Sequence, residues 1–275
     1  MASDSENKKP GRRWFQFRLR TLLVFMALLS IPFAWIGWEL QQRRAERPSI
    51  DWVTSSGGRI GRQSSGGAVI ASRSISGEID HPRSSKSWED WTDTLFGKRV
   101  RTVEFNDVHD ELRDLTPLMR FQKLQRFITC KVNVADLTAL SDLQSMSLLI
   151  LRNSQVQDLS ALAGLENLRG LFLQHTRGHD LAFLARLENL EFLELRGVEA
   201  GDLSPLAGLK KLKFLSLHEI EVEELTPLHE LKQLQKIGFH DVSVDSIKLG
   251  SGEEEHEQIE AIREALPDCE LHGIE

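Results

Sequence analysis

The 275-residue chain contains no tyrosine and only two cysteines, Cys130 and Cys269. Two cysteines in a chain of this length exclude a disulfide scaffold, and they do not form a C-x-x-C pair for zinc or redox chemistry. Neither lies near the N-terminal apolar segment, so we expect no bacterial lipid anchor. The sequence also lacks G-x-S-x-G, H-E-x-x-H, Walker and G-x-G-x-x-G motifs. We therefore predict that the protein is not an enzyme and holds no cofactor.

Charge is distributed unevenly along the chain. Residues 1–48 carry nine Lys/Arg and four Asp/Glu, whereas residues 99–275 carry 19 Lys/Arg and 31 Asp/Glu, a net charge of −12. An acidic domain repels phosphate backbones, so we expect no nucleic-acid binding. The basic N-terminal block adjoins an apolar run, and this combination indicates that the N-terminal region contacts a membrane rather than nucleic acid.

The longest apolar run is TLLVFMALLSIPFAWIGW, residues 21–38, with 18 residues and no charge. As a helix it would span about 27 Å, close to the ~30 Å hydrocarbon core of a bilayer. Trp35 and Trp38 close the run, as interfacial aromatic residues do. We predict a transmembrane helix over residues 19–40, with a cleaved signal peptide or a buried helix of a soluble domain as alternatives.

Positive charge sets the predicted orientation of this helix. Six Lys/Arg precede the run and three follow it, so the positive-inside rule places residues 1–18 in the cytoplasm. The predicted location is therefore the cytoplasmic membrane, crossed once, with everything after the helix outside the cytoplasm. Residues 41–87 are rich in Ser, Gly and Arg and are predicted to be a flexible linker, or alternatively to contain a small hairpin.

The strongest pattern is a fixed period of 22 residues over 114–245. Acidic residues start six repeats without insertion, at Asp114, Asp136, Asp158, Asp180, Asp202 and Glu224. Apolar residues are expected at offsets 1, 4, 7, 10, 13, 15, 18 and 20 from each start, and of these 48 positions only Thr129, Ser154, Thr176 and Gly178 are not apolar. Leucine at fixed offsets with this period is the signature of a leucine-rich repeat.

Each repeat predicts one coil of a solenoid. Offsets 13 and 15 share one face of a strand, while offsets 1, 4, 7 and 10 suit a short helical or 3-10 segment. Thr116, Ser204 and Thr226 precede prolines, which predicts an N-cap at the hydroxyl residue and a helix start at the proline. The predicted fold class is α/β: a solenoid with a parallel β-sheet on its concave face and short helical or 3-10 segments on the convex side, preceded by one transmembrane helix.

Both ends of the array are expected to be capped. Residues 88–113 should form the N-terminal cap through Trp88 and Trp91, together with an atypical first coil at Val100–Val108. Residues 246–275 should form the C-terminal cap. They combine an amphipathic helix, with apolar residues at helical spacing, and a short last strand.

The unit L-x-x-L-x-L followed by DLSPL-x-x-L resembles the internalin-type repeat of bacterial surface proteins, over about half of the chain. The whole layout is also similar to that of membrane-anchored repeat proteins of bacteria. The resemblance implies a fold and a binding mode but no particular ligand. Internalin repeats usually hold Asn at offset 18, whereas this chain has Val132, Ser154, Thr176, Val198, Ile220 and Val242. We therefore expect weaker side-chain hydrogen bonding along the coil.

Side chains at offsets 12, 14 and 16 should point out of the concave face, because they alternate with the buried strand positions. They form an apolar centre with a polar rim, the anatomy of a protein-binding surface. The candidate binding residues are Ile128, Ile150, Arg152, Phe172, Gln174, Phe192, Glu194, Arg196, Phe214, His218 and His240. The alternative is that the Phe rings fold over neighbouring strands, or that residues 49–98 cover them.

His218 and His240 both stand at offset 16 and should be neighbours. A metal would need a third ligand, but Arg196 holds the equivalent place in the next coil, so we expect no metal site. The predicted function is a membrane-anchored module that binds a protein or peptide on its concave face outside the cytoplasm. The alternative is a non-catalytic regulatory or sensory subunit whose repeats face the cytosol.

Overall fold

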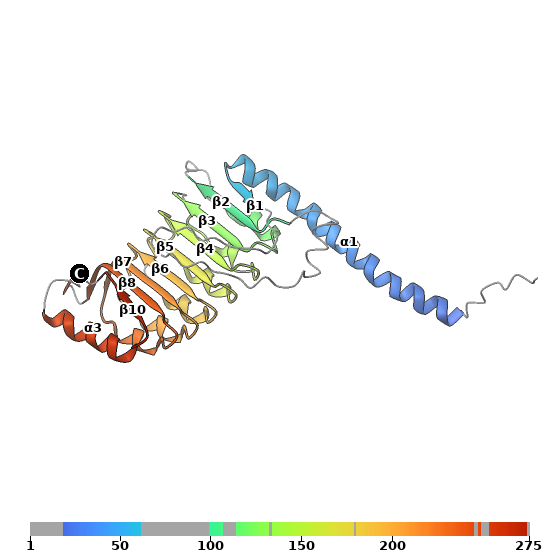
Figure 1. The fold of residues 1–275 in the computed structure, drawn as a ribbon. Coiled ribbons are helices and arrows are strands. Elements are labelled where there is room, and N and C mark those ends of the chain that lie inside the picture. Colours follow the sequence, from blue (N-terminus) through green and yellow to red (C-terminus); the bar gives the residue numbers. More distant parts are fainter. Residues whose placement is uncertain are drawn as a thin grey trace, which may run out of the picture. The chain divides into compact units, whose positions relative to one another are not determined.

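The computed structural model describes residues 19–61, 99–106, 114–131, 134–178, 180–244, 247–248 and 253–273. The chain divides into two compact units, one ending at Arg44 and the other comprising Ala45–Glu275. The second unit contains all the strands and is drawn as a ribbon in Figure 1.

The first element, α1, is a helix over Leu19–Ser55. It does not end near residue 40 as predicted, so residues 41–55 are helical rather than part of a linker. Most residues between 41 and 47 are strong helix formers, and Arg43 forms an i,i+4 ion pair with Glu39 at 2.9 Å. Within the part of the chain that the structure describes, no helix is long and apolar enough to cross a membrane.

Ten strands form one sheet in the order β1-β2-β3-β4-β5-β6-β7-β8-β10, with β9 pairing with β8 off this path. Their bounds are β1 Arg59–Gly61, β2 Thr102–Asn106, β3 Arg126–Cys130, β4 Leu148–Arg152, β5 Gly170–Gln174, β6 Phe192–Arg196, β7 Phe214–Val222, β8 Lys236–Val244, β9 Ile247–Lys248 and β10 Glu270–His272. From β3 to β8 the strands are parallel and the register advances by 22 residues at each step. The repeat period is therefore the strand-to-strand step of the sheet.

Six 3-10 helices lie on the opposite side of the coils from the strands (Figure 1). They are η1 Thr116–Arg120, η2 Thr138–Leu140, η3 Ser160–Gly164, η4 Ala182–Arg186, η5 Ser204–Gly208 and η6 Thr226–Glu230. Between helix and strand, asparagine side chains tie adjacent coils together: Asn167 and Asn189 donate to the carbonyls of Gln144 and Glu166 in the preceding coils, at 3.0 and 2.8 Å.

The predicted N-cap was wrong by one position. The leucine at offset 1 precedes each helix without a side-chain cap, and Thr116, Ser204 and Thr226 are the first helical residues. The acidic residue at offset 0 supplies the hydrogen bond instead. Its Oδ1 accepts the N–H of offset 2 at 2.7–2.8 Å in the pairs Asp114–Thr116, Asp136–Thr138, Asp158–Ser160, Asp180–Ala182 and Asp202–Ser204. An Asp side chain reaches the backbone two residues ahead, as in an Asx turn, so no hydroxyl is needed.

The core is the stack of repeated apolar side chains, which confirms the predicted leucine-rich-repeat architecture. The six leucines at offset 4 are all 0% exposed: Leu118, Leu140, Leu162, Leu184, Leu206 and Leu228. Three hydroxyl residues also enter this core. Thr129, Ser154 and Thr176 are buried, and no described residue hydrogen-bonds to their side-chain oxygens.

The N-terminal edge of the sheet is covered by β1 and the end of α1. β1 pairs antiparallel with β2, the Trp52 ring packs edge-on against Phe105 at 5.7 Å, and Val53 is fully buried. This cap was not predicted, because it comes from residues assigned to the linker. Trp88 and Trp91, which were expected to form the cap, lie outside the described residues.

The other end of the sheet carries α3, a helix over Glu253–Ala265, followed by β10. Ile259, Ile262 and Leu266 are buried against the last coil. Lys232 donates to the carbonyl of Ala265 at 3.0 Å, which ties the end of the helix to the last repeat.

Candidate functional site

The eleven residues selected from the sequence lie on one face of the sheet, which we call the concave face. Pairing between β3 and β8 aligns them in three rows. The offset-12 row is Arg126, Leu148, Gly170, Phe192, Phe214 and Lys236; the offset-14 row is Ile128, Ile150, Phe172, Glu194, Ser216 and Gly238; the offset-16 row is Cys130, Arg152, Gln174, Arg196, His218 and His240.

An apolar cluster occupies the middle of the concave face. Leu148, Ile150, Phe172 and Phe192 pack together, with Ile128 and Phe214 at the margins, and the rings of Phe192 and Phe214 stack at 4.7 Å. The expectation of an exposed patch was wrong for the four central residues, which are only 1–6% exposed. The centre of the face is therefore not open to solvent.

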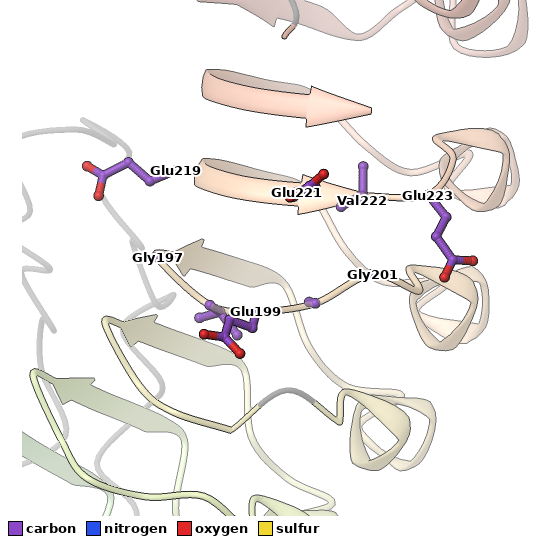
Figure 2. Close-up of a pocket in the computed structure, with 9 residues that line it drawn as sticks. Gly197, Glu199, Gly201, Glu219, Glu221, Val222 and Glu223 are labelled. Carbon is purple, nitrogen blue, oxygen red and sulfur yellow. The ribbon is translucent and has the colours of Figure 1, made fainter. Parts of the chain in front are cut away.

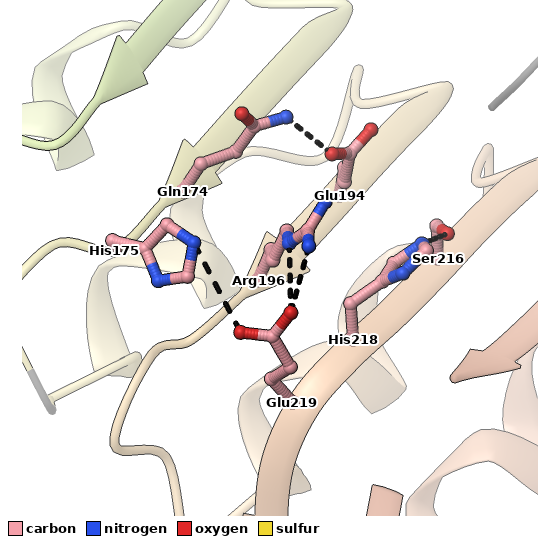
Figure 3. Close-up of polar contacts among 7 residues, drawn as sticks. All are labelled: Gln174, His175, Glu194, Arg196, Ser216, His218 and Glu219. Atoms are coloured by element: carbon pink, nitrogen blue, oxygen red, sulfur yellow. Dashed lines mark hydrogen bonds and ion pairs between the residues drawn. The ribbon is translucent and has the colours of Figure 1, made fainter. Parts of the chain in front are cut away.

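A buried carboxylate borders this cluster. Glu194 lies between Phe172 and Ser216 in its row and is 3% exposed. Gln174 Nε2 donates to its Oε1 (Figure 3), whereas Oε2 is buried and accepts no hydrogen bond from any described residue. Arg152 Nε, in the neighbouring row, is also buried and has no acceptor within the described ranges. An unsatisfied buried polar atom is costly, so both atoms indicate positions where another chain segment can supply a hydrogen bond.

The histidine pair forms the polar end of the face. His218 and His240 stack with their ring centroids 4.3 Å apart, and Ser216 Oγ lies 2.7 Å from His218 Nε2. Burial, aided by the neighbouring His240 and Arg196, lowers the pKa of His218 to about 4. His218 is therefore neutral at pH 7 and acts as a hydrogen-bonding group rather than a charge.

Glu219 joins this face, although the sequence did not single it out. Its Oε1 accepts from Arg196 Nη2 at 2.7 Å and its Oε2 lies 4.0 Å from His175 Nε2 (Figure 3). Glu219 stands at offset 17, where the backbone turns with φ of 50–54° in every repeat, at Lys131, Asn153, His175, Gly197, Glu219 and Asp241. This turn directly follows the last outward-facing strand position, so the period alone could have identified it.

An acidic cleft of about 580 Å³ lies beside the strand ends (Figure 2). It is lined by Gly197–Gly201 of one coil and by Glu219, Glu221, Val222 and Glu223 of the next. Figure 2 shows Glu219 and Glu223 pointing away from one another. Among the residues that the structure describes, no three His, Cys, Asp or Glu side chains converge as metal ligands.

A smaller hollow of about 240 Å³ lies at the C-terminal end of the concave face. Its walls include Phe214, Ser216, Lys236, His240 and His272. Gly238, which has no side chain and pairs with His272 in the adjacent strand, also lines it. Lys236 brings a positive charge to this hollow, and His272 Nε2 lies 3.4 Å from Glu270 Oε2.

No protein-family profile and no curated protein sequence matches the chain. Solved structures resemble it, however. Internalin C2 of Listeria monocytogenes is 24% identical over 68% of this chain and 73% of that one, with a TM-score of 0.51. Internalin F of the same organism is 20% identical over 65% of this chain but only 55% of that one, with a TM-score of 0.45. The first similarity shows the fold: this chain is a leucine-rich-repeat solenoid like that of internalin C2.

Proposed function

We propose that the chain is a non-catalytic interaction module that binds an extended protein or peptide segment on its concave face. The supporting observation is the combination on one face of an apolar cluster with two buried polar atoms, Glu194 Oε2 and Arg152 Nε, that lack partners within the described ranges. An extended segment presents both N–H and C=O groups and apolar side chains at ~3.3 Å per residue. Such a segment can therefore pack against the apolar cluster and hydrogen-bond to both polar atoms at the same time.

The hollow above Gly238 suits the end of such a ligand. A carboxylate placed there would face the Lys236 ammonium, and opposite charges favour association and set direction. The preferred ligand is therefore an extended segment with apolar residues followed by an acidic group or a C-terminal carboxylate.

A capture experiment tests this function. We expect Phe172→Ser with Phe214→Ser to abolish capture of envelope proteins by the purified array, because both rings belong to the concave face. Met119→Ser is the matched control, since Met119 is 37% exposed on η1, away from the strands. Circular dichroism checks that each variant keeps its fold. Unchanged capture by the folded double variant would contradict the proposal.

We also propose that residues 19–40 anchor the array in the cytoplasmic membrane, with residues 1–18 inside and the repeats outside. The uncharged run 21–38 and its more basic N-terminal flank support this. The second candidate is a regulatory or sensory subunit facing the cytosol, which the three Lys/Arg after the run favour. Protease added to intact cells separates the two: an external array is clipped, whereas a cytosolic one is cut only after lysis.

A further inference from the structure

The hollow at the C-terminal end of the concave face gathers polar atoms around one glycine. A Cβ on Gly238 would lie 3.5 Å from Ser216 Oγ and 3.7 Å from His240 Nε2, so these two atoms border the space above the glycine. Lys236 lines the same hollow. The hollow therefore offers an ammonium, an imidazole edge and a hydroxyl to a ligand group of opposite charge.

A stacked pair of imidazoles stands beside this hollow. The rings of His218 and His240 have their centroids 4.3 Å apart and their planes at 22°, and Ser216 Oγ lies 2.7 Å from His218 Nε2 (Figure 3). A protonated His218 donates from Nε2 to that oxygen, which leaves the single hydroxyl hydrogen of Ser216 for an acceptor in the hollow. The charge of the pair is thus linked to the donors that the hollow presents.

We infer that the hollow binds a ligand carboxylate together with a proton, and that the His218–His240 stack accepts this proton. The inference rests on the proposed function, because the hollow is the end of the same concave face. It adds a positioning role for the two histidines and makes ligand binding dependent on pH.

Charged and titratable groups around the stack come from four strands: Arg196 on β6, Glu219 on β7, Lys236 and Asp241 on β8, and Glu270 and His272 on β10. Burial, His240 and Arg196 lower the pKa of His218 to about 4, whereas Glu219 and Asp241 act in the opposite direction. Glu219 is also bound to Arg196 at 2.7 Å. In the free chain, therefore, His218 carries no proton at neutral pH.

A carboxylate in the hollow changes this balance. Its negative charge beside His240 Nε2 and Ser216 favours a proton on the stack, so the complex binds a proton more tightly than the free chain does. Linkage is reciprocal, and the proton strengthens carboxylate binding by the same factor. The affinity should rise as the pH falls from 7, by at most about tenfold per pH unit for one proton, and should level off near pH 4, where the free chain is itself protonated.

Labelled peptides added to the full chain in detergent micelles test the inference by fluorescence polarisation. Three hexapeptides of alternating valine and serine differ only at their ends, which are a free C-terminal carboxylate, a C-terminal amide, and an aspartate followed by an amide. We expect Kd for a carboxylate-bearing peptide to fall about tenfold from pH 7 to pH 5, and Kd for the plain amide to stay constant. The acidic peptide that responds identifies the source as a chain terminus or a side chain. An equal gain by the plain amide, or no gain by any peptide, would overturn the inference.

Substitution locates the proton. The double variant His218→Gln with His240→Gln keeps hydrogen-bonding groups but cannot titrate, so its Kd should be the same at pH 7 and pH 5. His229→Gln is the matched control, because His229 lies on η6 on the opposite side of the coil, and it should keep the pH dependence. Circular dichroism at both pH values checks that each chain is folded. A pH dependence that survives in the double variant would exclude the stack as the proton acceptor.

Calorimetry covers the case in which the double variant does not fold. Titration of the unaltered chain in two buffers of different ionisation enthalpy counts the protons taken up on binding. We expect about one proton per bound peptide at pH 5 and none at pH 8. No uptake at pH 5, or proton release, would contradict the inference.

The two proposals fail separately. Capture of envelope proteins without any gain in peptide affinity on acidification leaves the proposed function standing and refutes the proton-coupled site. Peptide binding with proton uptake, but without capture of any envelope protein, leaves the carboxylate site standing and contradicts the proposed protein partner.

Discussion

Single residues show where this coil departs from an ideal apolar stack. Thr129, Ser154 and Thr176 occupy core positions, and their hydroxyls have no partner among the described residues. The sequence predicted weak side-chain bonding along the coil from the absence of Asn at offset 18, and the structure places Ser154 and Thr176 at that offset. A buried hydroxyl without a hydrogen bond destabilises the folded state.

Replacing such a hydroxyl with a methyl group should therefore stabilise the array. We expect Thr176→Val to raise the free energy of unfolding by about 1 kcal/mol, because valine has the same shape without the unsatisfied oxygen. Urea denaturation measures this as a higher midpoint at an unchanged slope. Val198→Thr, at the same offset in the next coil, is the matched control. Its free energy of unfolding should fall by a similar amount. A less stable Thr176→Val variant would refute this reading.

His218 gives the fold a predictable response to pH. Its pKa in the folded state is about 4, below the ordinary 6.5, because of burial and the neighbouring His240 and Arg196, partly offset by Glu219 and Asp241. Between these two values the unfolded chain binds more protons than the folded chain. The free energy of unfolding therefore falls as the pH drops from 6.5 to 4, by at most about 3 kcal/mol, and this contribution is constant above 6.5.

The variant His218→Gln removes this titration. Denaturation between pH 4 and 6.5 should show a shallower pH dependence for the variant than for the unaltered chain. Identical slopes would mean that His218 is not shielded from protons in the folded state.

At the scale of elements, the period predicted the strands and 3-10 helices but not how the helices are capped. The repeat predicts which residues are buried. Buried residues two apart indicate a strand, and buried residues three apart indicate a helical turn. The cap depends on whether a side chain at offset 0 or at offset 2 reaches the backbone, which the hydrophobic pattern does not reveal. Asp158, for example, accepts the N–H of Ser160 at 2.8 Å.

The cap can be tested at η3. Hydrogen bonds from the Ser160 hydroxyl and backbone lower the pKa of Asp158 below its usual 3.8. We expect Asp158→Ala to lower the melting temperature at pH 7, and Asp158→Asn to lower it less, since the amide oxygen can still accept. Because the folded pKa is lowered, the carboxylate's advantage over asparagine is complete above 3.8 and disappears as the pH falls through the folded value. Melting curves at pH 7 and pH 2 check both points; equal melting temperatures for all three chains at pH 7 would exclude a capping role.

The N-terminal cap shows the limit of prediction from composition. Residues 41–55 were assigned to a linker because of the Ser- and Gly-rich stretch that follows, yet they complete α1, and Trp52 and Val53 pack on the first coil. These residues belong to no repeat, so no period identifies their partners. Only tertiary packing against Phe105 reveals their role.

At the scale of the whole molecule, the solenoid and the residues of its concave face could be predicted, but their exposure could not. The three rows follow directly from the 22-residue step, and the structure aligns them strand by strand. The burial of Phe172 and Glu194 is a tertiary property of this face, and the hydrophobic period does not encode it. The apolar centre and the hollow beside Lys236 are the features on which the proposed protein recognition rests.

In the proposed function, this protein contacts its partner through the concave face and not through the side that carries the 3-10 helices. Photo-cross-linking in living cells tests it most directly, with a benzophenone amino acid at His240, exposed at the end of the face, or at Met119 on η1. We predict cross-links to another protein from position 240 that disappear when Phe172→Ser and Phe214→Ser are added, and none from position 119. Cross-links from position 119 alone, or cross-links from position 240 that persist in the double variant, would contradict the claim.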